Sequence, residues 1–321
     1  MKIARFLLED VVRVGSVVGD VVQPLDPGVT VLDLLAMTPT ERTGVDRVGN
    51  AEDVDHVTLL SPIEPTSIRD FMTFQEHVEG TIQLSGGPGT PITPEWYEAP
   101  TFYFTNTAAV TGPNEDIPIP PGCELLDFEL EVAAVLGRSG RDLSPVDAHE
   151  RIAAYTIFND WSARDLQGRE MRVRLGPCKG KDFANTLGPW LVTADELEDH
   201  RIDDRLDLDA EVFVNGERVG ADTFANMGWS FEEMVAYASR GTEVRPGDVL
   251  GSGTMGTGCL AEAWGRTQQR IPPPLRAGDV VTTTVQGLGT IRNTVVAGRV
   301  VRHEIPPARP PRHLRDRSGT S

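Results

Sequence analysis

Four acidic residues lie in or beside apolar runs and could supply oxygen ligands to a metal ion. Glu129 and Glu131 stand two apart in CELLDFELEVAAVLG, and a strand places such residues on one face. Asp160 ends the apolar run AAYTIFND, and Asp70 lies in SIRDFMTF after another apolar stretch. A face of ordinary solvated glutamates is the alternative interpretation of the pair. If the four residues meet, an all-oxygen set favours Mg²⁺, Mn²⁺ or Ca²⁺ over Zn²⁺.

The elements that must position these carboxylates are mostly short strands. DAEVFVNGERV alternates around the Asn-Gly pair at 215–216, which suits a type I′ hairpin turn. RPGDVL and RAGDVV each place a Gly-Asp turn before a strand. Two helices have recognisable starts: Ser144 caps SPVDAHERIAA with proline following, and Ser230 with Glu233 forms a capping box. The pattern predicts a mainly β protein with a few helices, an α+β fold.

Composition limits the classes of function. Of 321 residues, 39% are hydrophobic and 24% charged, which is typical of a globular chain. A net charge of -18 argues against nucleic acid as a partner, because binding it relies on basic residues. No apolar run is long enough for a membrane span, and no secretory signal is recognisable, so we expect a cytoplasmic protein. The three dispersed cysteines are expected to be reduced and partly buried, without a disulfide.

The motifs in their order resemble the fumarylacetoacetate hydrolase family. LLDFELEVAAVLG is followed by IFNDWSARDLQ, LGPCKGKDF and GPWLVT, and the similarity spans roughly residues 60 to 300. The resemblance implies a mixed β-roll around a metal site, a smaller N-terminal domain and a homodimer. We expect a β-rich N-terminal domain at 1–62, a catalytic domain at 63–305 and a disordered Pro/Arg-rich tail at 306–321.

The resemblance also implies a role for each candidate residue. Asp70, Glu129, Glu131 and Asp160 would bind one divalent cation, Mg²⁺ or Mn²⁺, with Ca²⁺ as a further candidate. His77, seven residues after the first aspartate, would be the general base on water, a task that suits imidazole.

Other matched positions would support the base or contact the substrate. Glu262 would orient the histidine, although a structural salt bridge is the alternative. Lys181, preferred to Lys179 two residues earlier, would stabilise an enolate or carboxylate. The expected substrate-binding residues are Tyr103, Arg164, Gln167 and Thr254, and Arg164 could instead hold the metal carboxylates.

Three positions depart from the pattern of the family. Asn106 lies in a segment where many relatives carry a basic residue. Met171 and Asn185 occupy positions where the mammalian-type hydrolases have tyrosine and threonine. We interpret all three as substrate-side positions, so they leave the identity of the substrate open and the metal site intact.

The resemblance implies a metal-dependent hydrolase that cleaves a carbon–carbon bond in a 1,3-diketo acid. Fumarylacetoacetate, fumarylpyruvate and acylpyruvates are the candidate types of small oxo-acid substrate. Decarboxylation of a 2-oxo acid, isomerisation of a muconate-type dioate and hydration of a dienoate are alternatives, because all pass through a metal-bound enolate. A non-catalytic metal-binding protein with the same fold is the alternative from another class.

Overall fold

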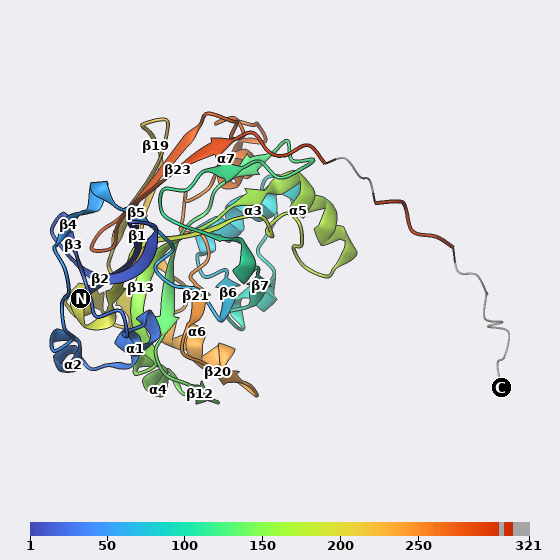
Figure 1. Cartoon of the computed structure of the whole chain (residues 1–321). Coiled ribbons are helices and arrows are strands. Elements are labelled where there is room, and N and C mark those ends of the chain that lie inside the picture. Colours follow the sequence, from blue (N-terminus) through green and yellow to red (C-terminus); the bar gives the residue numbers. More distant parts are fainter. Residues whose placement is uncertain (302–304, 311–321) are drawn as a thin grey trace.

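The computed structural model describes residues 1–301 and 305–310, and its centre is one large mixed sheet (Figure 1). The hydrogen-bonded order is β4-β3-β2-β1-β15-β13-β11-β21-β6-β7, with β5 beside β1 and β8 beside β15. The strands of this sheet are β1 (Lys2–Leu8), β2 (Val11–Val18), β3 (Val21–Pro24), β4 (Glu52–Asp53), β5 (Thr58–Leu59), β6 (Ser67–Phe71), β7 (Phe102–Thr105), β8 (Val110–Thr111), β11 (Leu130–Leu136), β13 (Ile152–Asp160), β15 (Asn185–Thr193) and β21 (Asp248–Gly251).

A second sheet and short helices complete the architecture. The second sheet has the order β19-β18-β22-β23-β9, and three two-stranded ribbons lie outside both sheets. Their bounds are β9 (Ile117–Pro118), β18 (Asp209–Val214), β19 (Glu217–Thr223), β22 (Val280–Val285) and β23 (Gly289–Val296), with ribbons β10 (Leu126–Asp127) and β14 (Ser162–Ala163), β12 (Gly140–Arg141) and β20 (Glu243–Val244), β16 (Arg201–Ile202) and β17 (Arg205–Leu206). The α-helices are α1 (Val31–Ala36), α2 (Pro39–Thr43), α3 (Gln75–Gly86), α4 (Pro145–His149), α5 (Arg164–Glu170), α6 (Phe231–Ala238) and α7 (Leu260–Thr267).

The predicted fold class is confirmed: strands dominate, and a small N-terminal β region precedes the rest. Its strand β1 pairs antiparallel with β15, so the N-terminal strands extend the main sheet at one edge (blue in Figure 1). Among the described residues, no helix has the length and apolar character that a membrane span requires.

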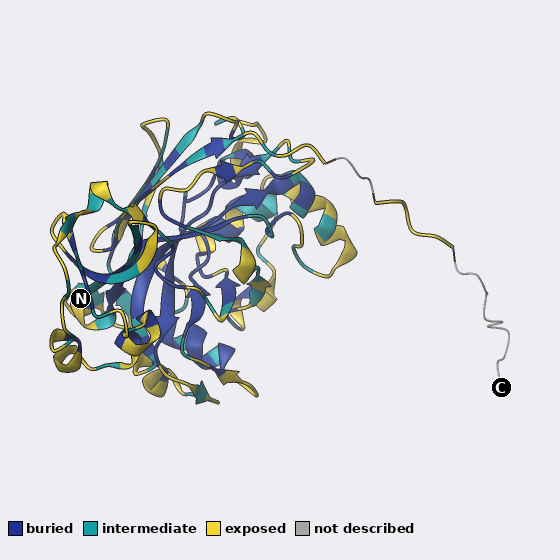
Figure 2. Ribbon diagram, in the orientation of Figure 1, coloured by how far each residue is buried: buried dark blue, intermediate teal, exposed yellow. Residues whose placement is uncertain are grey.

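Every residue of strand β11 is buried, so the strand is covered on both faces. Figure 2 shows the strands in the middle of the molecule in dark blue, the colour of buried residues. Val132 and Ala134 pack into the larger hydrophobic cluster, whereas Ala133 and Val135 pack into a second cluster with helix α1. A strand covered on both faces reads as a continuous apolar run, as this one does. Glu129 and Glu131 precede Ala133 at the same two-residue spacing, so their carboxylates adjoin a buried core and not a solvated face.

Most local expectations hold. The hairpin β18–β19 turns at Asn215 and Gly216, which have φ of 53° and 84°, as a type I′ turn requires. The capping box opens α6 as predicted. The helix that Ser144 caps is shorter than predicted, because Ile152 pairs with Leu136 and already belongs to β13.

Two further expectations concern the cysteines and the tail. Cys123, Cys178 and Cys259 form no disulfide, as predicted. Cys178 is exposed, whereas the sequence predicted a partly buried thiol. Residues 305–310 form no helix or strand, and the rest of the proposed tail, from 311 to 321, lies outside the described residues.

Helices α3 and α7 pack unusually closely, because each presents a glycine to the other. A Cβ atom on Gly265 would lie 1.9 Å from the carbonyl oxygen of Gly80. A Cβ on Gly80 would in turn lie 2.9 Å from the Cβ of Glu262. This contact fixes the first turns of both helices, where His77 and Glu262 lie.

We therefore predict that Gly265→Ala destabilises the fold. The added methyl group must push the backbones of α3 and α7 apart, and overpacking of this kind costs about 1–3 kcal/mol. Denaturant unfolding followed by circular dichroism measures the change. Gly168→Ala in α5 is the matched control: its Cβ would meet no atom within 4 Å, so it should be neutral or slightly stabilising. Equal stability of the two variants would contradict the prediction.

Candidate metal centre and active site

Four carboxylates meet near the ends of three strands of the main sheet. Asp70 lies on β6, Glu129 directly precedes β11, Glu131 lies in β11, and Asp160 ends β13. One carboxylate oxygen of each residue lies within 4.8 Å of those of the other three. None of the four residues is more than 5% exposed. Strand β21 runs between β6 and β11, and a Cβ on its Gly251 would lie 2.7 Å from Asp70 Oδ1. The missing side chain on that strand makes room for the cluster.

The cluster fits a hard divalent cation. Asp70 Oδ1, Glu131 Oε1 and Asp160 Oδ1 are buried and have no hydrogen-bond partner among the described residues. Buried polar atoms are normally paired, because an unpaired one loses its water contacts without replacement. Glu131 Oε2 is held by the N–H group of Gly253 at 3.0 Å, which leaves the other oxygen free for a ligand. An all-oxygen donor set of this kind suits Mg²⁺ or Mn²⁺.

The pKa values of the carboxylates in the cluster shift in opposite directions. Burial and the charge of Asp160 raise the pKa of Asp70 well above its ordinary range. Burial and the charge of Asp70 do the same to the pKa of Glu131. At Glu129, burial acts in the same direction, but the positive charges of Arg164 and Lys181 outweigh it and hold the pKa well below its usual range. Without a cation, part of the cluster therefore stays protonated.

Two basic side chains lie against the carboxylates. Lys181 Nζ contacts Glu129 Oε2 and Asp160 Oδ2. Arg164 Nη2 lies 2.7 Å from Glu129 Oε1 and 2.8 Å from Asp127 Oδ2. The expected proximity of Lys181 to the cluster is present. For Arg164, the sequence left open contact with the substrate or with the carboxylates of the cluster. The structure contains the second contact, to Glu129.

Sequence reasoning missed Asp127, which is fully buried. Besides Arg164, it accepts hydrogen bonds from the N–H groups of Leu260 at 2.8 Å and Ala261 at 3.0 Å. It thus ties the first turn of α7, where unpaired N–H groups favour a negative charge, to the arginine beside the cluster. A signal was present, because Asp127 stands two residues before Glu129 and continues the same alternation.

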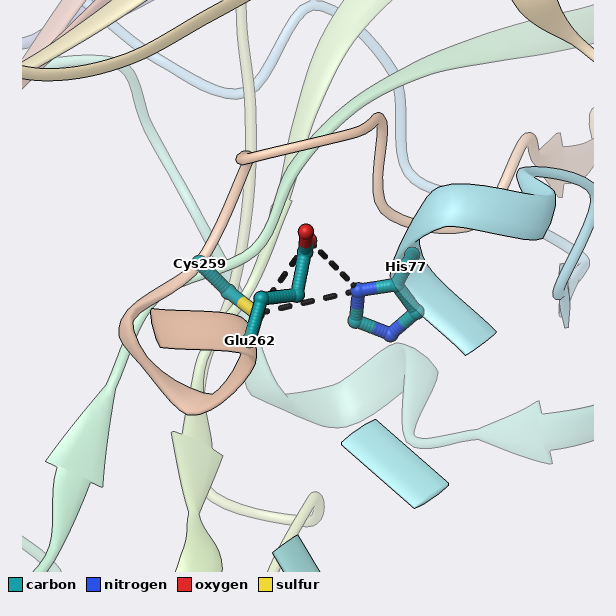
Figure 3. A group of neighbouring side chains, drawn as sticks. All are labelled: His77, Cys259 and Glu262. Carbon is teal, nitrogen blue, oxygen red and sulfur yellow. Dashed lines mark hydrogen bonds and ion pairs between the residues drawn. The ribbon is translucent and has the colours of Figure 1, made fainter. Parts of the chain in front are cut away.

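His77 and Glu262 form a buried pair (Figure 3). His77 Nδ1 lies 2.9 Å from Glu262 Oε1, and His77 Nε2 lies 3.8 Å from Glu129 Oε1. Glu262 Oε2 accepts a hydrogen bond from the N–H group of Thr257 at 2.8 Å. Glu262 also lies 3.3 Å from Arg266, so the alternative of a salt bridge is partly present. The histidine contact is the shorter of the two.

One cavity of about 470 Å³ gathers most of the predicted residues. Tyr103, whose hydroxyl donates to Asp160 Oδ2, lines it together with Gln167 and Thr254. Gln167 Oε1 accepts a hydrogen bond from Arg164 Nη1 at 3.2 Å. The other predicted residues on its wall are Asp70, His77, Glu129, Glu131, Arg164 and Lys181, whereas Asp160 and Glu262 are not part of the wall.

Of the three positions that depart from the family pattern, one lines the cavity and two do not. Met171 lines the cavity, as expected of a substrate-side residue. Asn106 and Asn185 do not line it, which corrects their interpretation as substrate-side residues. Asn185 Nδ2 instead donates to the carbonyl oxygen of Asn106 at 3.2 Å, and the pair links β15 to the segment after β7.

The fold and the site define a protein class: a mostly β architecture with a candidate acidic metal centre beside a histidine–carboxylate pair. The family model described as "Fumarylacetoacetate (FAA) hydrolase C-terminal" matches residues 66–296. A second model, "Rv2993c-like, N-terminal", matches residues 1–62. The chain belongs to the fumarylacetoacetate hydrolase family.

Relatives in this family carry different activities. The chain is 29% identical over 260 residues to a fumarylacetoacetase of Oryza sativa, with 66% of this chain and 60% of the relative covered. It is 33% identical over 260 residues to a mitochondrial oxaloacetate tautomerase of Xenopus laevis, with 80% and 74% covered. The chain thus spans about 60% of the length of the plant fumarylacetoacetases that it matches.

Solved structures share the fold over nearly the whole chain. A 5-carboxymethyl-2-hydroxymuconate delta-isomerase from Mycobacterium smegmatis is 25% identical with a TM-score of 0.69, covering 92% of this chain and 100% of that one. A maleylpyruvate hydrolase from Sphingobium sp. SYK-6, solved with manganese(II) and pyruvate, is 22% identical with a TM-score of 0.67, covering 93% and 100%. A divalent metal is typical of the family.

Glu131→Gln tests the metal centre. The variant keeps an acceptor for the N–H group of Gly253 but loses a charge, so metal affinity should fall and activity should be lost while the fold survives. Calorimetric titration with Mn²⁺ and circular dichroism measure these changes. Full activity of the variant in chelator-washed buffer would contradict the assignment.

The raised pKa values of Asp70 and Glu131 also predict a pH dependence for the metal-free protein. Above the ordinary carboxyl pKa, the folded state holds protons that the unfolded chain has released, so the free energy of unfolding falls as pH rises. A bound cation should remove this loss. Thermal unfolding from about pH 5 to pH 8, with chelator or with Mg²⁺, measures it, and metal-free Glu131→Gln should show a shallower decline. Equal slopes in the two metal-free proteins would count against the prediction.

Proposed function

We propose that this protein hydrolyses a carbon–carbon bond in a 1,3-diketo acid. The observation that supports this most is the His77–Glu262 pair beside the four-carboxylate cluster, with His77 and most of the cluster on the wall of one cavity. A base must remove a proton from the attacking water, and a cation must withdraw electrons from the carbonyl group that is attacked. The two groups of residues suit these two needs.

Asp70, Glu129, Glu131 and Asp160 would hold the cation. Bound there, Mg²⁺ or Mn²⁺ would supply a Lewis acid for the oxo group of the substrate. His77 has Nδ1 tied to Glu262, so the tautomer with a proton on Nδ1 leaves the lone pair of Nε2 free. Nε2 takes a proton from water, and the hydroxide adds to the remote carbonyl carbon.

The carbon–carbon bond then breaks, and its electron pair passes into an enolate of the departing oxo acid. The protonated His77 returns its proton to the carbon that leaves, which balances the addition of one water. Lys181 is buried and forms ion pairs with two carboxylates. Its ammonium group would lie beside the developing negative charge. The mechanism thus gives one role each to the carboxylate cluster, the His77–Glu262 pair and Lys181.

The comparisons support this proposal and also supply a second candidate. The rice relative is a fumarylacetoacetase, and the Sphingobium hydrolase was solved with manganese and pyruvate. The frog relative, which covers more of this chain, is an oxaloacetate tautomerase. Tautomerisation or isomerisation of an oxo acid would use the same cation and the same base, without attack by water. Decarboxylation remains a further alternative.

The wall of the cavity narrows the substrate proposal. Of its described residues, Arg164 and Lys181 are the ones with permanent positive charge, and both already contact carboxylates of the cluster or Asp127. Other parts of the wall are apolar, with Met72, Leu84, Phe102, Met171 and Pro177. A second carboxylate on the substrate would find no uncommitted cation among the described residues of the wall, and burying it unpaired is costly. We therefore favour an acylpyruvate with a neutral acyl tail over a dicarboxylate.

The remaining proposals concern the oligomeric state, the domain division and the cellular location of the protein. We keep the homodimer, the division into domains 1–62 and 63–305 and the cytoplasmic location as proposals. The residues that match the two family models, 1–62 and 66–296, are compatible with that division.

His77→Ala separates the candidate reactions. Loss of a general base typically lowers the rate by about 10²–10⁴-fold, so hydrolysis should fall by that factor with little change in KM. Decarboxylation of oxaloacetate needs the cation but no attacking water, so it should fall less. Glu262→Gln should act in the same direction more weakly, and the double variant should be little worse than His77→Ala.

Both rates are measured on one preparation with Mg²⁺. His149→Ala is the matched control, because His149 Nδ1 also pairs with a glutamate, Glu232 at 3.0 Å, but lies outside the cavity wall. Its activity should equal that of the unmodified protein. Equal losses of hydrolysis and decarboxylation in His77→Ala would mean that His77 shapes the pocket and does not activate water.

The acyl tail is tested with pairs of substrates of similar length. We expect kcat/KM for a neutral acylpyruvate to exceed that for fumarylpyruvate by at least about tenfold, because the extra carboxylate is buried unpaired. Loss of the enol absorbance follows both reactions. Met171→Arg, which adds a cation to the wall, should shift the ratio toward the dicarboxylate, and Met171→Gln should not. A preference for fumarylpyruvate in the unmodified protein would reject the neutral tail.

A further inference from the structure

A second group of potential ligands adjoins the carboxylate cluster. His77 Nδ1, Glu262 Oε1 and Cys259 Sγ converge in the structure (Figure 3). The sulfur lies 3.7 Å from both the nitrogen and the oxygen, which are 2.9 Å apart. All three side chains are at most 5% exposed. The proposed mechanism gives the cysteine no task.

The donor types in this group differ from those of the cluster. Nitrogen, sulfur and oxygen together suit Zn²⁺ or Cd²⁺, whereas four carboxylates suit a harder ion. Tetrahedral zinc with bonds of about 2.0–2.3 Å separates its ligand atoms by about 3.3–3.6 Å. The three observed separations bracket that range, so a few tenths of an ångström of movement would complete three corners of a tetrahedron.

The three side chains sit on a stiff frame. Cys259 is the residue before α7, Glu262 is in the first turn of α7, and His77 is in the first turn of α3. The glycine contact between these helices leaves little room for them to separate. Glu262 Oε2 is fixed by the N–H group of Thr257, which leaves Oε1 directed at the histidine and the sulfur. Such outer contacts orient metal ligands.

We propose that His77, Cys259 and Glu262 form a binding site for one zinc-like divalent cation, distinct from the carboxylate cluster. On binding, the thiol proton leaves to solvent and the imidazole proton moves from Nδ1 to Nε2. Thiolate and carboxylate together balance the two positive charges, which suits a buried site. His77 lines the cavity, so the cation can reach the group from there.

Occupation of this site would stop the reaction. With Nδ1 on the cation and a proton on Nε2, the imidazole has no lone pair for water. Zinc would then inhibit the enzyme while Mg²⁺ remains at the carboxylates. This consequence rests on the proposed function of His77, whereas binding itself does not.

Titration of the Mg²⁺-saturated full chain with Cd²⁺ tests the binding. One equivalent should produce the charge-transfer absorption of a cadmium–thiolate bond. Cys259→Ser and Cys259→Ala should both lose this band, with folding checked by circular dichroism. Cys178→Ser and Cys123→Ser are the matched controls and should keep it. A band that persists in both Cys259 variants, or that disappears in Cys178→Ser, would overturn the proposal.

Activity provides the second measurement. Zinc should inhibit the Mg²⁺-loaded enzyme, and in Cys259→Ser the concentration for half inhibition should rise by at least about 100-fold, because a direct ligand is lost. Inhibition that is unchanged in Cys259→Ser would mean that zinc acts by displacing Mg²⁺ from the carboxylates, against the proposal. Absence of turnover in zinc-free, Mg²⁺-loaded protein would contradict the proposed function alone and leave the cadmium result standing.

Discussion

The repulsion among buried carboxylates is the constraint on which the site depends. Asp70, Asp127, Glu129, Glu131 and Asp160 are each at most 5% exposed and lie close together. Arg164 and Lys181, which contact these carboxylates, offset only part of their charge, and a bound divalent cation would bring the balance near neutrality. Burying like charges without compensation is costly. The protein therefore keeps a concentrated negative potential that a cation relieves.

The sheet makes this concentration possible. The four candidate ligands lie on or directly beside β6, β11 and β13, and each of these strands pairs with a neighbour on both sides. The neighbours β15 and β21 are themselves almost wholly buried, whereas β7 at the edge is partly exposed. Rigid strands can hold groups that would move apart on a loop. Gly251 on β21 shows how closely the frame is fitted, because any larger residue would occupy the space of Asp70 Oδ1. The energy of the apolar core is what holds the charges together.

The sequence predicted what depends on local spacing and on family resemblance. The two-residue spacing of Glu129 and Glu131 gave their shared face, and the cap at Ser230 gave the start of α6. Contacts between segments that are far apart in the sequence could not be predicted from local spacing or from the resemblance. The length of the helix after Ser144 was set by strand pairing, and the roles of Asp127 and Asn185 were set by partners far along the chain. Tertiary context outweighs local preference at such positions.

One contact between two helices places His77 between two chemically different environments. The packing of α3 on α7 brings its Nδ1 against a carboxylate and a sulfur, while its Nε2 lies 3.8 Å from a carboxylate of the metal cluster. Orientation by a carboxylate fixes the tautomer of a histidine. The contact that would prepare His77 as a base therefore also brings together three donors of the types that zinc prefers. In these two proposals, selectivity for hard cations rests on the carboxylate cluster, whereas sensitivity to softer cations follows from the contacts that hold His77.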